Sequence, residues 1–219
     1  MSRKSWIILG LFVLLIAAGA WHFLGGESDM KTVGGSASAP IYEPLPTDHT
    51  FGNPKAKVTV IEYASPTCPV CAKFMMDDYP RLKRDYIDTN KIFYVFRTFP
   101  RVADDVAAEK LARCFPADKY MEFQDSLYRN QSKWDYEFGI PSPDGVHAAL
   151  IELAGAAGMN EADANKCIAS TTEEAAIAKV GEDGVAKYNV SATPTFVING
   201  QAQAGFDAFF ERLDAALAK

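Results

Sequence analysis

The stretch Cys68-Pro69-Val70-Cys71 constrains this chain more than any other feature. It directly follows an apolar, β-branched run at residues 58–64 and opens a predicted helix. Two cysteines in this spacing at a strand-to-helix junction can form a small reversible disulfide. The helix N-terminus presents unpaired backbone N–H groups and the positive end of the helix dipole to Cys68, which favours its thiolate. We predict that Cys68 is a nucleophile and that Cys71, one turn further and more buried, is the resolving thiol.

The composition is that of a globular chain with a core of its own. Its 219 residues are 48% apolar and 12% aromatic, which is enough for one domain of ordinary size. Four cysteines are too few for a disulfide scaffold in a chain this long, so each of them needs its own explanation. The formal net charge of −6 argues against nucleic acid as a partner.

The first 24 residues form a separate segment, which we interpret as a membrane anchor or a signal. Arg3 and Lys4 precede an apolar span, residues 6–24, of roughly 19 residues, just long enough to cross a bilayer. Residues 18–20, Ala-Gly-Ala, also match a signal-peptide cleavage site. We favour the uncleaved anchor, because Trp21 and the following histidine suit a membrane interface.

Either interpretation sends the rest of the chain out of the cytoplasm. Basic residues ahead of the span keep the N-terminus inside, so a flexible tether at residues 25–49 and the folded part lie outside. We expect the periplasmic side of the inner membrane or an equivalent extracytoplasmic compartment, with the protein anchored, or soluble if the signal is cleaved. Disulfide chemistry suits such an oxidising compartment.

The folded domain is predicted to begin near Thr50 and to reach the C-terminus at residue 219. A strand at residues 58–64, a helix from Cys68 to about Ile87 and a strand at residues 92–96 form a βαβ unit with parallel strands. We expect Pro80 to kink or split that helix.

The remainder of the domain divides into a helical block and a β-hairpin. Residues 102–188 are Ala-rich and helical, with breaks at Pro116, at residues 139–143 and at Gly158. A strand at 195–198, an Asn-Gly turn, a short partner strand at 201–204 and a closing helix follow. This order predicts an α/β, thioredoxin-like fold with a helical insertion between the βαβ half and the C-terminal hairpin and helix.

From about Phe51 onwards the chain resembles the DsbA-like thiol:disulfide oxidoreductases of the thioredoxin superfamily. Several motifs carry the resemblance in the family's order: Gly52-Asn53-Pro54-Lys55-Ala56-Lys57-Val58, Glu62-Tyr63-Ala64, Cys68-Pro69-Val70-Cys71 and Thr193-Pro194-Thr195-Phe196.

The resemblance implies roles for individual residues. Cys68 would be the nucleophile and Cys71 the resolving thiol, with no metal and no cofactor. Glu62 would be the buried acid that moves a proton to and from the resolving cysteine. Thr193 and Pro194 would lie beside the active disulfide, on a cis peptide bond, and contact the substrate.

Two of these positions affect the expected redox character. The best-known members of the family carry histidine where this chain has Val70, and a cationic neighbour there would lower the pKa of Cys68 further. We therefore expect a more moderate oxidant. Thr193 also resembles the isomerase members of the family.

The predicted function is that of an exported oxidoreductase that introduces or exchanges disulfides in other exported proteins with cysteine thiols. A quinone-coupled membrane reoxidase of the DsbB type would return it to the oxidised state. We expect a monomer, because no dimerisation module precedes the domain. Two alternatives stay open: a disulfide isomerase or reductase kept reduced by a membrane donor, and a non-enzymatic chaperone or peptide-binding module.

Cys114 and Cys167 are predicted to form a second, structural disulfide between two helices of the insertion. A loop of this size adds roughly 3–4 kcal/mol in the chain-entropy model. Two rivals are a pair of buried free thiols and a zinc site shared with Cys68 and Cys71. The zinc site is the weaker rival, since zinc pairs usually come as two closely spaced couples and Cys114 and Cys167 are 53 residues apart.

Overall fold

The computed structural model describes residues 42–140 and 142–219. The predicted anchor or signal at residues 1–24, and the part of the predicted tether up to residue 41, lie outside these residues. Within the described ranges, no helix has both the length and the apolar character that a bilayer crossing requires.

A five-stranded sheet lies at the centre of the domain, in the order β1-β3-β2-β4-β5. Strands β2 and β3 are parallel, and the other neighbouring pairs are antiparallel. The strands are β1 (His49–Gly52), β2 (Val58–Ala64), β3 (Ile92–Thr98), β4 (Thr195–Ile198) and β5 (Gln201–Ala204). The parallel β2–β3 pair and the β4–β5 hairpin confirm the predicted thioredoxin-like order. Strand β1, which pairs with the outer edge of β3, was not predicted.

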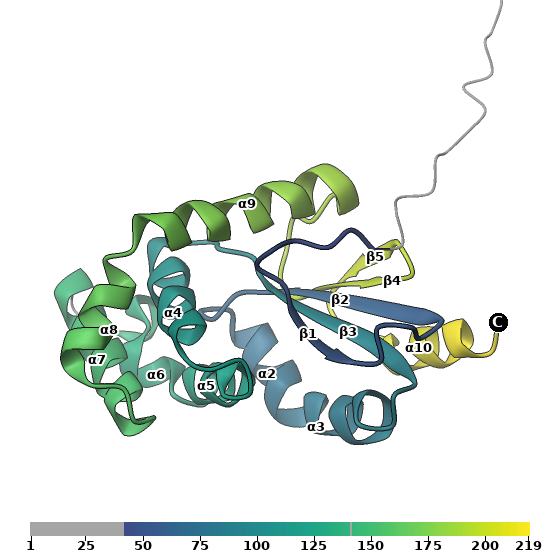
Figure 1. Ribbon diagram of the computed structural model, residues 1–219, viewed down its shortest axis with the longest axis horizontal. Coiled ribbons are helices and arrows are strands. Elements are labelled where there is room, and N and C mark those ends of the chain that lie inside the picture. Colours follow the sequence, from purple (N-terminus) through teal and green to yellow (C-terminus); the bar gives the residue numbers. More distant parts are fainter. Residues whose placement is uncertain (1–41, 141) are drawn as a thin grey trace, which may run out of the picture. The chain divides into compact units, whose positions relative to one another are not determined.

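Helices cover both faces of the sheet, as Figure 1 shows. On one face lie α2 (Pro69–Asp77), α3 (Tyr79–Leu82), a π-helical turn at Lys83–Ile87 and α10 (Phe209–Leu217). On the other lies α9 (Thr171–Tyr188). The aromatic rings of Phe74 and Phe209 lie 4.6 Å and 4.5 Å from that of Phe196, so α2, α10 and β4 meet in one core.

The central strand β2 separates two cores because its side chains alternate between the faces. Val60 joins the large cluster under α2 and α10, whereas Ile61 and Tyr63 join the cluster under α9. Gly184 allows α9 to come close, since a Cβ at that position would lie 2.8 Å from the ring of Tyr63. Burial on both faces explains why all seven residues of β2 are covered.

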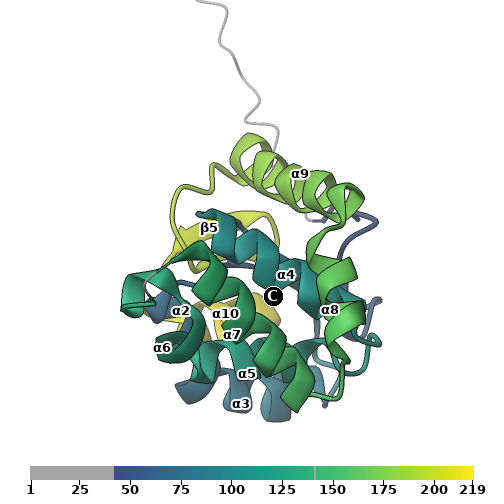
Figure 2. The ribbon, with the colours of Figure 1, turned by 90° about the vertical axis from the view of Figure 1, so that its left-hand side faces the viewer.

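The helical insertion forms one end of the domain (Figure 2). It contains α4 (Ala103–Cys114), α5 (Tyr120–Arg129), α6 (Gln131–Trp134), a 3-10 turn at Tyr136–Phe138, α7 (Pro143–Ala156) and α8 (Glu161–Ile168), and α9 leads from it back over the sheet. The predicted breaks are confirmed: Pro116 lies between α4 and α5, and Gly139 and Gly158 adopt φ of 101° and 95° after a helix end.

The predicted helix from Cys68 to Ile87 is present in three pieces. Asp78 separates α2 from α3, and Pro80 lies at the start of α3, where its missing N–H is tolerated. The split confirms the expected effect of Pro80.

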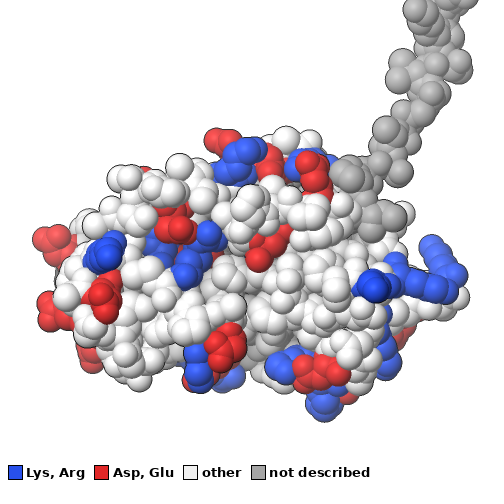
Figure 3. All heavy atoms as spheres, viewed as in Figure 1, with Lys and Arg blue, Asp and Glu red and all other residues white. Residues whose placement is uncertain are grey.

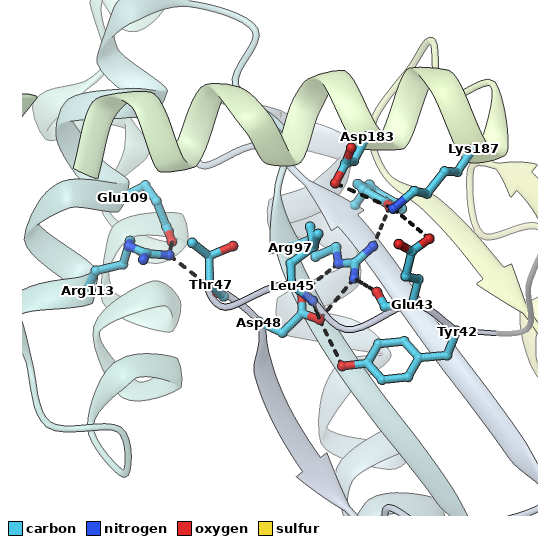
Figure 4. Close-up of polar contacts among 11 residues, drawn as sticks. Tyr42, Glu43, Leu45, Thr47, Asp48, Arg97, Glu109, Arg113, Asp183 and Lys187 are labelled. Carbon is cyan, nitrogen blue, oxygen red and sulfur yellow. Dashed lines mark hydrogen bonds and ion pairs between the residues drawn. The ribbon is translucent and has the colours of Figure 1, made fainter. Parts of the chain in front are cut away.

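Residues 42–48 pack against the domain instead of continuing the tether, as Figure 4 shows. The Asp48 carboxylate accepts hydrogen bonds from Nε and Nη2 of Arg97 at 2.6 Å and 2.9 Å, and these two side chains are only 3% and 1% exposed. Tyr42 and the backbone N–H of Leu45 also donate to Asp48. Residues 42–49, which the sequence had predicted to belong to a flexible tether, are therefore part of the folded domain. A buried guanidinium on β3 needs a carboxylate, and this segment supplies it.

Candidate active site

Cys68 lies at the N-cap of α2, directly after the loop that leaves β2. Its backbone is extended, Pro69 occupies the first helical turn, and its Sγ accepts a hydrogen bond from the N–H of Cys71 at 3.4 Å. The sulfur thus takes the place of a capping oxygen at the positive end of the helix.

The Cys68 thiolate is strongly stabilised. A hydrogen bond from the Cys71 thiol makes the largest contribution to lowering the pKa of Cys68 to about 5, against the opposing effect of burial. Thr193 and the backbone of Val70 and Cys71 lower it further. At neutral pH Cys68 is therefore ionised and able to act as a nucleophile.

Cys71 has the opposite character. Its side chain is 1% exposed, against 4% for Cys68. Burial, together with the hydrogen bond to Cys68, raises the pKa of Cys71 well above its ordinary value. Both cysteines are free thiols in this structure. The pair consists of one ionised and one protonated sulfur, which is the arrangement that a dithiol needs before it passes electrons to a disulfide.

Glu62 is buried in β2, with 1% exposure. Desolvation raises the pKa of Glu62 to about 8, although a hydrogen bond from the Tyr94 hydroxyl on β3 opposes the shift. The negative charge of Glu62 also raises the pKa of Cys71, so the two groups interact through the core. Glu62 is thus a buried acid, as the resemblance implies.

Thr193 and Pro194 lie opposite the cysteines, 125 residues later in the chain. The peptide bond between them is cis, and Sγ of Cys68 lies 3.3 Å from the carbonyl oxygen of Thr193. The pairing of β4 with β2 carries the loop to this position. The structure thereby brings together all five residues that sequence assigned to the redox site.

Two further residues reach the site from the helical insertion and were not predicted. Asp105 of α4 accepts from the N–H of Thr67 at 2.9 Å and from the hydroxyl of Ser65 at 2.8 Å. Gln131 of α6 donates to the carbonyl oxygens of Pro66 at 2.7 Å and Cys68 at 3.1 Å. Both side chains fix the loop ahead of Cys68. The only local signal was an acidic residue in the first turn of α4, which is common at helix starts.

Tyr128 of α5 is a third buried polar residue near the cysteines. It is 2% exposed, and its hydroxyl has no hydrogen-bond partner among the described residues. Burial raises the pKa of Tyr128 well above its ordinary value, and the charges of Cys71 and Glu62 add to the effect. The core behind the active site therefore holds Tyr128 as a neutral phenol.

Cys114 and Cys167 lie apart from the redox pair and are bonded to each other. The disulfide joins the end of α4 to α8. A bonded pair leaves no thiolates for a zinc site shared with Cys68 and Cys71. Across the described part of the chain, no three His, Cys, Asp or Glu side chains are grouped so as to hold a metal ion.

A thioredoxin-type sheet, a C-x-x-C pair at the start of α2 and a cis-proline loop against the first cysteine define the thioredoxin class of fold and site. A family model described as thioredoxin matches residues 45–217, and the chain belongs to this family.

Named relatives and solved structures carry names from disulfide chemistry, DsbA among them. A Rickettsia typhi protein named as a protein-disulfide oxidoreductase is 34% identical over 161 aligned positions, and the alignment covers 70% of this chain and 55% of that protein. The chain thus spans little more than half of this relative. Disulfide bond formation protein D of Bacillus subtilis is 26% identical, over 74% of this chain and 72% of that protein. The crystal structure of Wolbachia pipientis alpha-DsbA1 covers 83% of this chain and 96% of its own, with a TM-score of 0.73 and 27% identity.

Proposed function

We propose that this protein is a thiol:disulfide oxidoreductase that introduces or exchanges disulfides in other exported proteins through Cys68 and Cys71. The observation that carries the proposal is the low pKa of Cys68, about 5, at the N-terminus of α2 and against the Thr193–Pro194 loop. The names of the relatives support the same chemistry.

The reaction begins with the Cys68–Cys71 disulfide. A substrate thiolate attacks Sγ of Cys68, a substrate–Cys68 disulfide forms, and the bond to Cys71 breaks with Cys71 leaving as a thiolate. A second substrate thiolate then attacks the substrate sulfur of the mixed disulfide and displaces Cys68. The substrate thiols lose two electrons and two protons in forming their disulfide. The protein gains the two electrons and one proton, with Cys71 as a thiol and Cys68 as a thiolate, and the other proton goes to solvent.

In this mechanism Glu62 acts in the step in which Cys71 leaves the disulfide. Its pKa of about 8 keeps it protonated at neutral pH, so it can supply the proton that the high-pKa Cys71 thiolate takes up. Thr193 and Pro194 lie where the substrate backbone approaches Cys68, and we assign them to substrate binding.

The direction of the net reaction follows from thiolate stability. A pKa of about 5 for Cys68 lies between about 7 for thioredoxin and about 3.5 for DsbA. A stabilised thiolate favours the reduced form and makes the disulfide a moderate oxidant, as the valine at position 70 suggests.

We propose an extracytoplasmic location, an N-terminal membrane anchor or cleaved signal, and reoxidation by a membrane protein of the DsbB type.

The reduction potential of the Cys68–Cys71 couple tests the oxidase assignment. The purified protein is equilibrated in glutathione buffers, and the thiols are trapped by alkylation and counted by mass. We expect a value between about −200 and −120 mV. A value near the thioredoxin value of about −270 mV would assign the protein to the reductase alternative instead.

Cys68→Ala tests the chaperone alternative, since a pure binding module keeps its activity in that variant.

A further inference from the structure

A cavity of about 290 Å³ opens between the start of α4 and the 3-10 turn at Tyr136–Phe138. Three carboxyl groups line it: Asp104, Asp135 and Glu137. Exposed apolar surface borders them, because Val102 is 41% exposed and Tyr136 is 56% exposed. Among the described residues that line the cavity there is no Lys, Arg or His.

Asp135 lacks a partner that its burial requires. The residue is 1% exposed, and its Oδ1 accepts from the N–H of Glu137 at 3.0 Å. Its Oδ2 is also buried but accepts no hydrogen bond from any described residue. A buried carboxylate oxygen without a partner is costly, and most such groups in folded proteins are satisfied. A donor from outside the chain would complete this site.

The surrounding charges favour a cation as that donor. Burial raises the pKa of Asp135, and its carboxyl neighbours Glu137, Asp104 and Asp105 raise it further. Elsewhere on the surface, several acidic side chains lie beside basic ones, as Figure 3 shows for one face. Arg129 pairs in this way with Asp125 and Lys179 with Asp183. The cavity carboxyls have no such counter-charge among the residues that the structure describes, and no group of these residues is arranged to bind a metal ion.

The cavity lies close to the redox pair. The Asp105 carboxylate accepts from the N–H of Val102 at 3.2 Å through Oδ2, and from the N–H of Thr67, the residue before Cys68, through Oδ1. A single carboxylate thus connects the cavity wall to the nucleophile's loop. On the other wall, Asp135 lies one helical turn after Gln131, which donates to the carbonyl oxygen of Cys68. A substrate bound at Cys68 therefore reaches the cavity within a few residues.

We propose that this cavity is a subsite for a lysine or arginine side chain of the substrate polypeptide, a few residues from the reacting cysteine. The proposal rests on the proposed exchange activity and adds a preference for basic flanking residues. The cation would pair with Asp104 and Asp135, and its aliphatic stem would lie on the ring of Tyr136.

The test uses pairs of short peptides that each carry one cysteine and one lysine, with the lysine free in one and acetylated in the other. The lysine is placed on either side of the cysteine in different pairs. The protein is first oxidised with glutathione disulfide, and the second-order rate of its reduction by each peptide is followed by acid quench and mass spectrometry. We expect the free lysine to react about three- to tenfold faster at low ionic strength, and the advantage to shrink in high salt.

Matched variants locate the effect. Asp104→Asn with Asp135→Asn should remove the advantage of the free lysine. Tyr136→Ala, a change on the surface, should reduce the advantage of the free lysine. This variant replaces the double variant in the test if the double variant does not fold. Glu211→Gln on α10, at the end of the domain opposite the insertion in Figure 1, removes one exposed negative charge and should leave the advantage unchanged. Equal rates for the two peptides, or an advantage that survives the double variant, would overturn the subsite.

A binding measurement separates this proposal from the exchange activity. The same peptides with serine in place of cysteine carry a fluorophore, and their affinity for the protein is measured by anisotropy. Tighter binding of the free lysine supports the subsite even if neither cysteine peptide reacts, an outcome that would refute the exchange activity alone. Equal binding together with equal rates refutes the subsite and leaves the exchange activity standing.

Discussion

At the level of single residues, three ionisable side chains of the site have pKa values displaced in the directions that exchange chemistry needs. Hydrogen bonds at a helix N-terminus lower that of Cys68 to about 5, whereas burial raises those of Cys71 and Glu62. At neutral pH the nucleophile Cys68 is therefore ionised, whereas the resolving thiol Cys71 and the buried acid Glu62 are protonated. The helix start favours negative charge and the core disfavours it.

Glu62 makes the fold less stable as the pH rises. Its pKa is about 8 in the folded protein, against 4.5 for an unperturbed glutamate, so the folded state binds the additional proton. Stability from this group is complete below the lower value and is lost as the pH rises towards the higher one.

We predict that Glu62→Gln removes that loss. The variant should gain roughly 2–5 kcal/mol over the parent between pH 5 and pH 8, measured by urea unfolding, while resolution of the mixed disulfide slows. Tyr94→Phe is the matched control, because it removes only the hydrogen bond that lowers the pKa of Glu62, so the loss of stability should extend to higher pH. A difference in unfolding free energy between the variant and the parent that stays constant with pH would contradict the raised pKa of Glu62.

At the level of elements, α4 and α6 of the insertion hold the loop that carries the nucleophile. Asp105 accepts from Ser65 and Thr67 on one side and from the N–H groups of Arg101 and Val102 on the other. The insertion is therefore part of the active site as well as a cover for the core.

We predict that Asp105→Asn lowers the free energy of unfolding by about 1–3 kcal/mol, because an amide nitrogen would face N–H donors that it cannot satisfy. The exchange rate of the folded variant should fall as well, because the loop ahead of Cys68 loses two of its bonds. Asp118→Asn, an exposed change before α5, should have neither effect. An unchanged rate in folded Asp105→Asn would show that Gln131 alone fixes the loop.

The segment at residues 42–48 closes over β3 through Asp48 and Arg97. Asp48→Ala leaves the guanidinium buried without its carboxylate, and we predict a loss of about 3–5 kcal/mol of unfolding free energy by urea titration. Replacing both residues, with Arg97→Met, should recover part of that loss. Glu43→Gln on the same segment affects only an ion pair whose glutamate is 56% exposed, so it should change stability by less than about 1 kcal/mol.

At the level of the whole molecule, the Cys114–Cys167 disulfide closes a long loop across the insertion, with a sequence separation of 53. We predict that replacing both cysteines with alanine destabilises the protein by about 3–4 kcal/mol. The reduction potential of the Cys68–Cys71 couple should stay unchanged, because the two pairs lie on different elements. A shifted potential would show that the insertion transmits strain to the redox pair.

Local sequence patterns were sufficient to predict most of the architecture. The alternating apolar strands, the proline at position 80, the glycines after helix ends and the Asn-Gly turn each act over a few residues, so their effect can be read from the chain. The C-x-x-C pair at the start of a helix is local in the same sense. The β1 strand was missed because its four residues alternate only weakly and gain their partner from β3.

What the sequence by itself determined was the order of the elements and the identity of the redox pair, because periodicity, turn residues and cysteine spacing are properties of neighbouring residues. Only the tertiary structure decided which distant side chains complete the site. Asp105 and Gln131 meet the loop before Cys68 from about 40 and 65 residues away, and Asp48 neutralises Arg97 from 49 residues away. Such contacts form where packed elements bring buried polar groups together, and no local pattern specifies which partner each group will find.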